Sequence, residues 1–180
     1  MHVAARMTRE EYLALPEPPR GVRFELLDGE LVTMNDPLAI HQIVAGRIYA
    51  ALLAWSDSRS DGGRVLLPVD TDVGPDTIFG PDVQWFAAGR PLPSPRERPW
   101  PVGDLVVEVA SPSTARYDAL VKAGRYADAG AREVWLVDPA GPTVRALRSA
   151  GQAPVVFGAG AVVTSPLLPG FVLPVDGLDR

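Results

Sequence analysis

A strand–helix–strand unit between residues 104 and 138 limits the fold of this chain more than any other feature. The run DLVVEVAS (104–111) is almost entirely apolar, which is typical of a strand buried on both faces. A helix is predicted to follow from Ser113 or Thr114 to about Ala129. EVWLVDP then predicts a second buried strand. Strands joined in this way normally lie parallel with a right-handed crossover, so the unit predicts a mixed α/β fold.

Other patterns predict the elements around this unit. MTREEYLAL indicates a short helix capped by Thr8, with Glu11 as its capping-box partner. Apolar spacing in residues 37–57 predicts a helix with one buried stripe. The remaining predicted elements are a β-hairpin over 22–34 turning at Asp28-Gly29, strands over 64–73 and 77–87, a proline-rich loop over 89–103, and short C-terminal strands. We therefore expect a central sheet with two substantial helices packed on it.

Length and composition exclude several classes of protein. The 180 residues favour a single domain over 1–180, and the absence of cysteine excludes disulfides, thiolate zinc sites and cysteine nucleophiles. The sequence has neither a signal-peptide pattern nor an apolar run of roughly 18 residues, so no membrane association and a cytoplasmic location are expected. A net charge of −5 disfavours a large phosphate-tracking surface, but metal-binding carboxylates also make a site acidic before the ion binds.

Glu108 is an anomaly within the apolar strand LVVEVA. An ionised carboxylate is costly to bury without a partner, so either a cation meets Glu108 or the strand is exposed at that position. Asp82 follows Pro81 at the start of another apolar stretch, DVQWF. Proline followed by aspartate is also common at turns, so Asp82 alone carries little information.

Lys122 is the only lysine in a sequence with sixteen arginines. On the predicted helix it shares a face with Asp118 and Tyr126 at i, i+4 and i+8. An exposed Asp118–Lys122 pair would contribute only about 0.3–0.5 kcal/mol, and arginine would serve equally well there. A compact ammonium on a flexible stem is better suited to catalysis. Two carboxylates and one lysine are the minimum set for metal-assisted phosphodiester hydrolysis with Mg²⁺ or Mn²⁺.

The order of these patterns resembles a known family. RFELLDGEL is followed by a histidine at a helix start, then by PDV, LVVEVASPST, an aspartate–lysine–tyrosine helix and EVWLVDP. In this order the chain resembles the Uma-two family of restriction-type endonucleases, in the PD-(D/E)XK nuclease superfamily, over residues 7–175. The resemblance implies a restriction-endonuclease-like fold, with a mixed β-sheet core, flanking helices and additional β-hairpins.

The resemblance also implies roles for individual residues. Asp82 and Glu108 match the metal-binding acids, and Glu25 matches a further metal or water ligand. The superfamily lysine two residues after the second acid is replaced by Ala110, and Lys122 matches the lysine that has moved onto the following helix. The remaining matches are His41 and Asp118 at recurring positions, and Tyr126, which is expected to brace the lysine or pack. A solvated face for Glu25 and simple packing for His41 remain open.

The expected function is Mg²⁺- or Mn²⁺-dependent hydrolysis of DNA. A non-catalytic DNA-binding or assembly module on the same fold, and a hydrolase of another phosphodiester such as RNA, remain alternatives. Arg96 and Arg98 in the proline-rich loop are candidate phosphate contacts, whereas Trp85 and Trp135 are expected in the core. Apolar C-terminal strands suggest a homodimer or a higher homo-oligomer.

Overall fold

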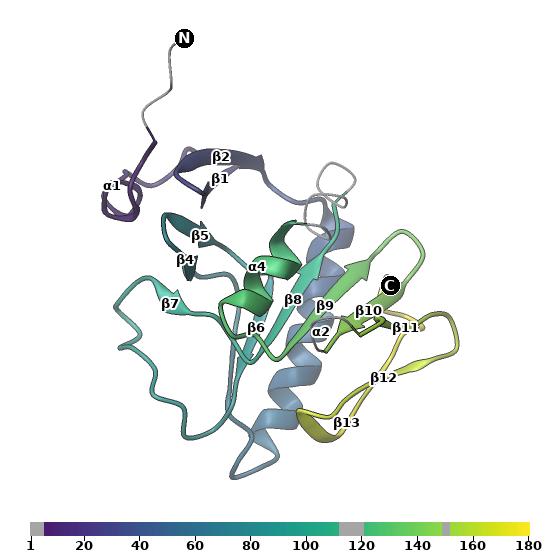
Figure 1. Ribbon diagram of the computed structural model, residues 1–180. Helices are drawn as coiled ribbons and strands as arrows, with labels where there is room; N and C mark the ends of the chain where they lie inside the picture. Colours follow the sequence, from purple (N-terminus) through teal and green to yellow (C-terminus); the bar gives the residue numbers. More distant parts are fainter. Residues whose placement is uncertain (1–5, 112–120, 149–151) are drawn as a thin grey trace.

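The computed structural model describes residues 6–111, 121–148 and 152–180 of the chain. Its strands form a five-stranded sheet, a six-stranded sheet and a two-stranded hairpin, with helices packed against them (Figure 1). The described helices are α1 (Arg9–Leu13), α2 (Ala39–Asp57) and α4 (Ala123–Asp128). The described strands are β1 (Val22–Leu27), β2 (Glu30–Asn35), β3 (Arg64–Leu66), β4 (Thr71–Gly74), β5 (Thr77–Phe79), β6 (Val83–Phe86), β7 (Trp100–Pro101), β8 (Leu105–Val109), β9 (Glu133–Asp138), β10 (Thr143–Leu147), β11 (Val155–Phe157), β12 (Val162–Ser165) and β13 (Leu168–Pro174).

The predicted crossover unit forms the centre of the six-stranded sheet, whose strand order is β11-β10-β9-β8-β6-β3. Strands β8 and β9 lie parallel, as predicted, and residues 105–109 are in register with 133–137. Every residue of β8 is buried. The first part of the predicted helix, from Ser113 or Thr114 to residue 120, lies outside the described residues. Its last part is α4, which ends at the predicted place with Ala129 as the cap and Gly130 at a φ of 104°.

The predicted N-terminal hairpin forms the edge of the five-stranded sheet, whose order is β2-β1-β5-β4-β7. Strands β1 and β2 pair antiparallel along their full length. Asp28 and Gly29 have φ values of 47° and 82°, the left-handed conformation that a two-residue hairpin turn requires. This hairpin lies at the top of the molecule in Figure 1, above the end of β8.

The segment from residue 64 to residue 87 differs from the prediction of two strands in one central sheet. Each predicted strand is divided: β3 pairs with β6 in the six-stranded sheet, whereas β4 pairs with β5 in the five-stranded sheet. Pro68 and Pro81 stand at the two divisions, and proline lacks the N–H that a ladder needs. The chain therefore passes from one sheet to the other and back, which joins the sheets beside Asp82.

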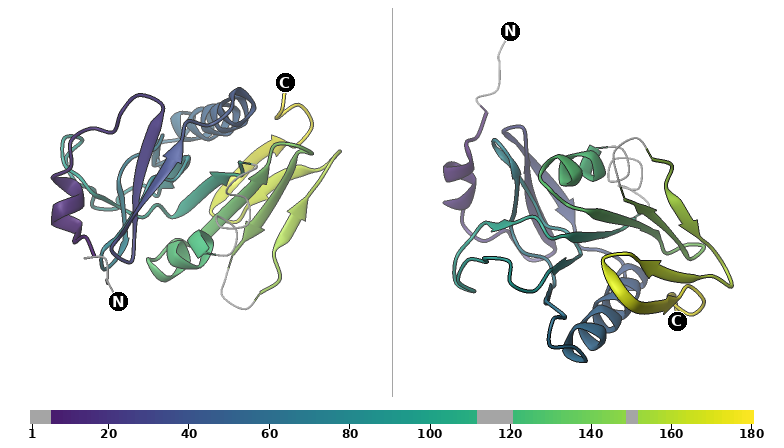
Figure 2. Two further views of the ribbon diagram at one scale, coloured as in Figure 1. Left: turned by 90° about the horizontal axis from the view of Figure 1, so that it is seen from above. Right: turned by 60° about the horizontal axis from the view of Figure 1, so that its bottom comes forward.

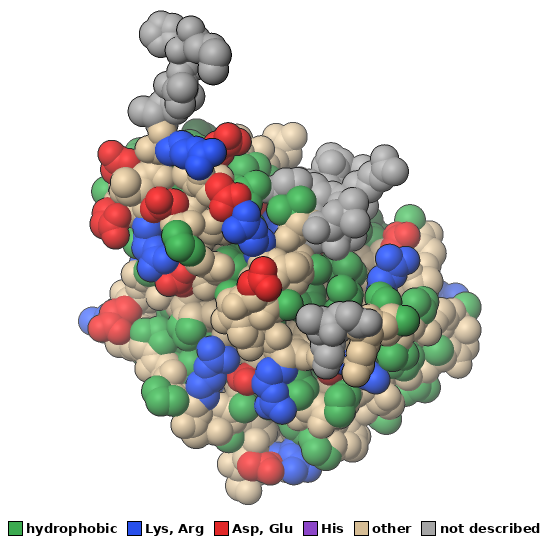
Figure 3. Space-filling model, in the orientation of Figure 1, with side chains coloured by type: hydrophobic (Ala, Val, Ile, Leu, Met, Phe, Trp, Pro, Cys, Tyr) green, Lys and Arg blue, Asp and Glu red, His purple; other side chains and the backbone are tan. Residues whose placement is uncertain are grey.

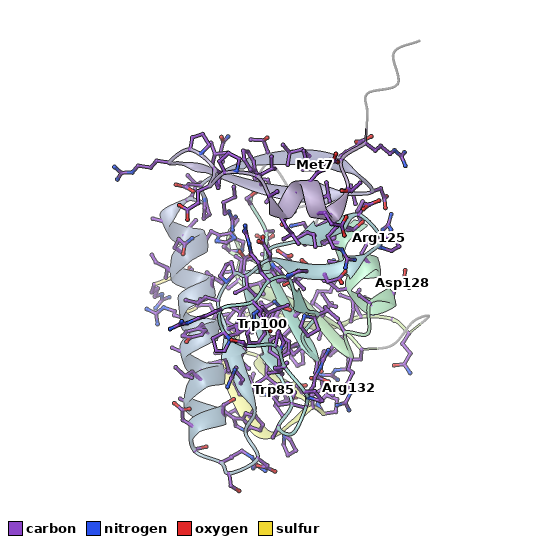
Figure 4. All side chains as sticks on the ribbon, turned by 90° about the vertical axis from the view of Figure 1, so that its left-hand side faces the viewer. Met7, Trp85, Trp100, Arg125, Asp128 and Arg132 are labelled. Carbon is purple, nitrogen blue, oxygen red and sulfur yellow. The ribbon has the colours of Figure 1, made fainter. Side chains whose placement is uncertain are left out.

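Helices α2 and α4 cover opposite faces of the six-stranded sheet (Figures 2 and 4). The apolar stripe predicted for the first of these helices is confirmed, since Val44, Ile48 and Leu52 are fully buried. They belong to the same core cluster as Trp85 and Trp135, which are buried as expected. The hairpin of β12 and β13 packs into this cluster on the α2 side.

Shorter elements fix the outer parts of the fold. Thr8 and Glu11 form the predicted capping box of α1. In the proline-rich loop, Arg98 Nη1 donates to Asp70 Oδ2 (3.0 Å) and its Nη2 donates to the Leu13 carbonyl (2.8 Å). Arg98 therefore holds the loop against α1. Arg96, in the same loop, is exposed. At the other end of the molecule, β11 is the outer strand of its sheet. Within the described residues, no helix is long and apolar enough to cross a membrane.

Candidate active site

A cavity of about 790 Å³ lies where the two sheets meet. The β1–β2 hairpin forms one wall, and the first turn of α2 and the end of β8 form the other. The charged residues and the histidine that line it are Arg23, Glu25, Glu30, Asp36, His41, Asp82, Glu108 and Lys122. Glu30 is exposed, as its place just after the hairpin turn suggests, but five of these ionisable residues are at most 5% exposed: Glu25, His41, Asp82, Glu108 and Lys122. Such burial of charge is unusual and marks this cavity as the candidate site.

Glu108 is 4% exposed, so the possibility that its strand is open to solvent at this position is wrong. The Tyr126 hydroxyl donates a hydrogen bond to Glu108 Oε1, and Lys122 Nζ lies 3.6 Å from the same oxygen. Burial and the neighbouring Glu108 carboxylate raise the pKa of Tyr126 well above its ordinary value. Tyr126 therefore stays protonated and braces the carboxylate rather than the lysine.

Glu25 is only 2% exposed, which excludes a solvated face. Its Oε1 accepts hydrogen bonds from Lys122 Nζ at 2.8 Å and from the Gly80 N–H at 3.0 Å. Its Oε2 is buried and has no hydrogen-bond partner among the described residues. A buried carboxylate oxygen without a donor is costly, and a bound cation would satisfy it.

Asp82 is 5% exposed and lies in the link between β5 and β6. Its Oδ2 accepts a hydrogen bond from the Val109 N–H at 2.8 Å and lies 3.1 Å from His41 Nε2. His41, in the first turn of α2, therefore contacts the site instead of merely packing under the sheet. These two contacts orient Asp82 beside the end of β8, and Asp82 and Glu108 line the same cavity.

Lys122 directly precedes α4, and its side chain is 3% exposed. Its Nζ lies between Glu25 and Glu108 and 5.2 Å from the centre of the Phe79 ring. The sequence predicted that Lys122 faces Glu108 and Asp82 rather than solvent. The described ion pairs of Lys122 are with Glu108, as predicted, and with Glu25. None of the described ion pairs joins Lys122 to Asp82, whose Oδ2 faces the Val109 N–H and His41.

The structure thus brings most of the candidate residues to one cavity from distant parts of the sequence. Those that line it are Glu25, His41, Asp82, Glu108 and Lys122. Tyr126 does not line the cavity but is buried and donates to Glu108, and Asp118 lies outside the described residues. Arg23 also lines the cavity and was not singled out from the sequence. The signal that points to it is strand alternation, since Arg23 and Glu25 project from the same face of β1.

The side chains of the cavity are chemically suited to binding a hard divalent ion, because they offer carboxylate oxygens, including the unsatisfied Oε2 of Glu25. In the described part of the chain, however, no three His, Asp or Glu side chains already stand around a common point. The Lys122 ammonium neutralises Glu25 and Glu108 in this arrangement. The residues therefore fit Mg²⁺ or Mn²⁺ by type, with the lysine holding two of the carboxylates.

Comparisons with known proteins agree with the fold and the family expected from the sequence. The sequence model of the Uma2 family, described as "Putative restriction endonuclease", matches residues 9–176. The fold is similar to the crystal structure of "a putative nuclease belonging to DUF820" from Anabaena variabilis, with a TM-score of 0.79 and 23% identity over 96% of this chain and 97% of that chain. No curated protein matches the chain. The expected nuclease-like α/β fold is therefore confirmed.

Proposed function

This chain belongs to the Uma2 family of restriction-type endonucleases, and from that premise we propose that it is a Mg²⁺- or Mn²⁺-dependent endonuclease that hydrolyses phosphodiester bonds of DNA. The observation that carries the proposal is the buried group of Glu25, Asp82, Glu108 and Lys122 in one cavity. Burying several charges is at best weakly stabilising compared with an apolar core, so stability alone does not account for them. Buried charges gathered in a cavity are typical of catalytic sites.

Each residue then has a role that its contacts support. Asp82, Glu108 and Glu25 would hold the metal ion, which when bound supplies a Lewis acid and lowers the pKa of an attacking water. Lys122 would position the attacking water and stabilise the charge that develops on the phosphate. His41 and the Val109 N–H orient Asp82, and Tyr126 orients Glu108. Both acids are thus held by neighbouring groups, as ligands at metal sites commonly are.

The proposal of a DNA substrate rests on the charged cavity and not on the net charge of the chain, which is negative. On the face shown in Figure 3, Lys and Arg side chains are interspersed with Asp and Glu side chains and do not form one extended basic surface. Because that face offers no extended basic surface, we assign neutralisation of the phosphate to cationic groups inside the cavity and to the ion that the site would hold. Two copies of the chain would cut both strands of a duplex, and the outer strand β11, with Val155 and Val156 exposed, supplies an edge for pairing.

A non-catalytic module on the same fold is the second candidate, and one observation favours it. Lys122 already pairs with two of the acids that would hold the ion. In a module without metal, this pairing would be the permanent state of the site.

Cleavage of plasmid and linear DNA in the presence of Mg²⁺ or Mn²⁺ tests the two candidates. We expect cleavage by the wild-type chain and loss of at least about 100-fold in rate for Asp82→Asn. Asp138→Asn, which changes an exposed aspartate at the end of β9, serves as the matched control and should cleave like the wild type. Metal-dependent cleavage that persists in Asp82→Asn would reject the assigned site, and absence of cleavage with DNA binding retained would favour the module.

A further inference from the structure

Arg23 stands between two cavities. It lines the large cavity of the candidate site and also a smaller one, of about 230 Å³, on the side of β1 that faces the end of α1. Tyr12, Phe24 and Pro16 contribute apolar surface to the smaller cavity. Glu25 borders both cavities, so the two meet at the metal-binding end of the site.

The guanidinium of Arg23 is not used as other arginines of the chain are. Arg9, Arg90 and Arg98 each donate a hydrogen bond to a carboxylate at 2.8–3.1 Å. Arg23 Nη1 instead lies 3.9 Å from Asp82 Oδ1, which is too long for a hydrogen bond. Its Nε is buried and has no hydrogen-bond partner among the described residues. Among the described residues, no carboxylate thus takes a hydrogen bond from Arg23, and the exposed third of its side chain can meet another acceptor.

Charge balance in the cavity indicates what that acceptor is. The wall is rich in carboxylates, and the Lys122 ammonium is paired with Glu25 and Glu108. Arg23 is a cation of this wall that is about one-third exposed. A phosphate can reach it, and a planar guanidinium matches two phosphate oxygens better than any other side chain does.

We propose that Arg23 binds a phosphate of the substrate strand at the border of the two cavities, with the adjoining nucleoside in the smaller cavity. This inference rests on the proposed function, since it assumes that the strand being cut is DNA bound at the candidate site. Arg23 then fixes the register of the strand relative to Asp82 and offsets the repulsion between the phosphates and the acidic wall.

Salt-dependent binding tests the contact without cleavage. Binding of a labelled DNA duplex is followed by fluorescence anisotropy at several salt concentrations, first without divalent metal and then with Ca²⁺. We expect Arg23→Gln to bind more weakly than the wild type and to lower the slope of log affinity against log salt by about 0.9, the loss of one phosphate contact. Arg23→Lys keeps the charge but not the planar fork, so it should keep the slope and lose affinity.

Arg59→Gln is the matched control, because Arg59 follows the opposite end of α2 and lines neither cavity. It should bind like the wild type. If Arg23→Gln keeps the wild-type slope of log affinity against log salt, Arg23 does not contact a phosphate. If Arg23→Lys keeps the wild-type affinity, the guanidinium does not bind two phosphate oxygens. Failure of the wild-type chain to bind DNA under either condition rejects the DNA substrate itself and this inference with it, so the two failures are distinguishable.

Discussion

Lys122 Nζ and Glu25 Oε1 lie 2.8 Å apart, although the two residues are separated by 97 positions in the sequence. Their side chains are 3% and 2% exposed. The pair connects β1 of the five-stranded sheet with the start of α4, which covers the six-stranded sheet. It therefore links the two halves of the site, and its rupture has consequences for both stability and activity.

Removing only one partner of this pair should be strongly destabilising. Lys122→Met leaves Glu25 and Glu108 buried without their ammonium, and we expect the free energy of unfolding to fall by about 3–5 kcal/mol. Adding Glu25→Gln to Lys122→Met should recover part of this loss, because one uncompensated charge is removed. Urea denaturation of the two single variants and the double variant measures the coupling. Strictly additive losses would contradict the buried pair.

Replacing Lys122 by arginine should not be conservative. The Lys122 ammonium lies 2.8 Å from Glu25, 3.6 Å from Glu108 and 5.2 Å from the centre of the Phe79 ring. A larger, planar guanidinium has to change these distances, so we expect a loss of about 1–3 kcal/mol in stability together with loss of cleavage. The reciprocal control is Arg125→Lys on the same helix, where the arginine bonds to Asp28 at the surface. That change should alter stability by less than about 0.5 kcal/mol. Comparable behaviour of the two variants would argue against a special role for the ammonium.

Tyr126→Phe should show whether the Tyr126 hydroxyl serves cleavage, by orienting Glu108, in addition to stabilising the fold. It removes the hydroxyl that donates to Glu108 Oε1, and we expect about 1–3 kcal/mol of lost stability and a lower rate of cleavage. Ser56→Ala is the control, because the buried Ser56 hydroxyl also donates within the protein, to the Gly62 carbonyl at 2.8 Å, but Ser56 lines neither cavity. Ser56→Ala should therefore lose stability and keep cleavage. Thermal melts and cleavage rates, measured in parallel, provide the comparison.

Binding of Mn²⁺ can be measured without DNA. Isothermal calorimetry should show binding to the wild-type chain and affinity lowered by at least about tenfold in Asp82→Asn, a loss that even outer-shell partners of metals often produce. Asp138→Asn should bind as the wild type does. Equal affinities of the two variants would place the ion elsewhere, and no binding to the wild type at millimolar Mn²⁺ would favour the non-catalytic module.

The packing of α2 supplies a prediction about stability alone. Ile48 is fully buried against the six-stranded sheet, whereas Ile43 on the same helix is 41% exposed. Ile48→Ala should cost about 2–5 kcal/mol, with transfer and cavity effects combined. Ile43→Ala should cost much less, below about 1 kcal/mol, since it leaves no cavity. Chemical denaturation measures both losses. A larger loss in Ile43→Ala than in Ile48→Ala would mean that α2 packs by another face.

Local patterns were sufficient for several elements of the fold. The Asp28-Gly29 turn, the Thr8–Glu11 capping box and the apolar stripe of α2 are each encoded within a few residues, and each is formed as predicted. The division of residues 64–87 between two sheets was missed. Apolar runs predict strands but do not say which neighbour each strand pairs with, and pairing depends on contacts far away in the sequence.

The site shows the same division between local and long-range information. The sequence placed a carboxylate within the apolar strand β8 and the only lysine on the helix that follows it, and a parallel crossover brings such residues near one another. It did not indicate that Glu25 is the nearest described carboxylate to Lys122, or that Arg23 lies beside Asp82. Both residues come from the N-terminal hairpin, and no pattern within that hairpin specifies where it docks.

By itself, then, the sequence determined the elements, the buried character of β8 and the types of residue available for chemistry, because these follow from local periodicity and from the cost of burying charge. Only the tertiary structure decided which charges face one another. The hairpin of β1 and β2 closes over the end of β8, and this docking buries Glu25 against Lys122 and leaves the guanidinium of Arg23 between two cavities. Electrostatic partnership depends on distances in space, and those distances are fixed when the two sheets pack together.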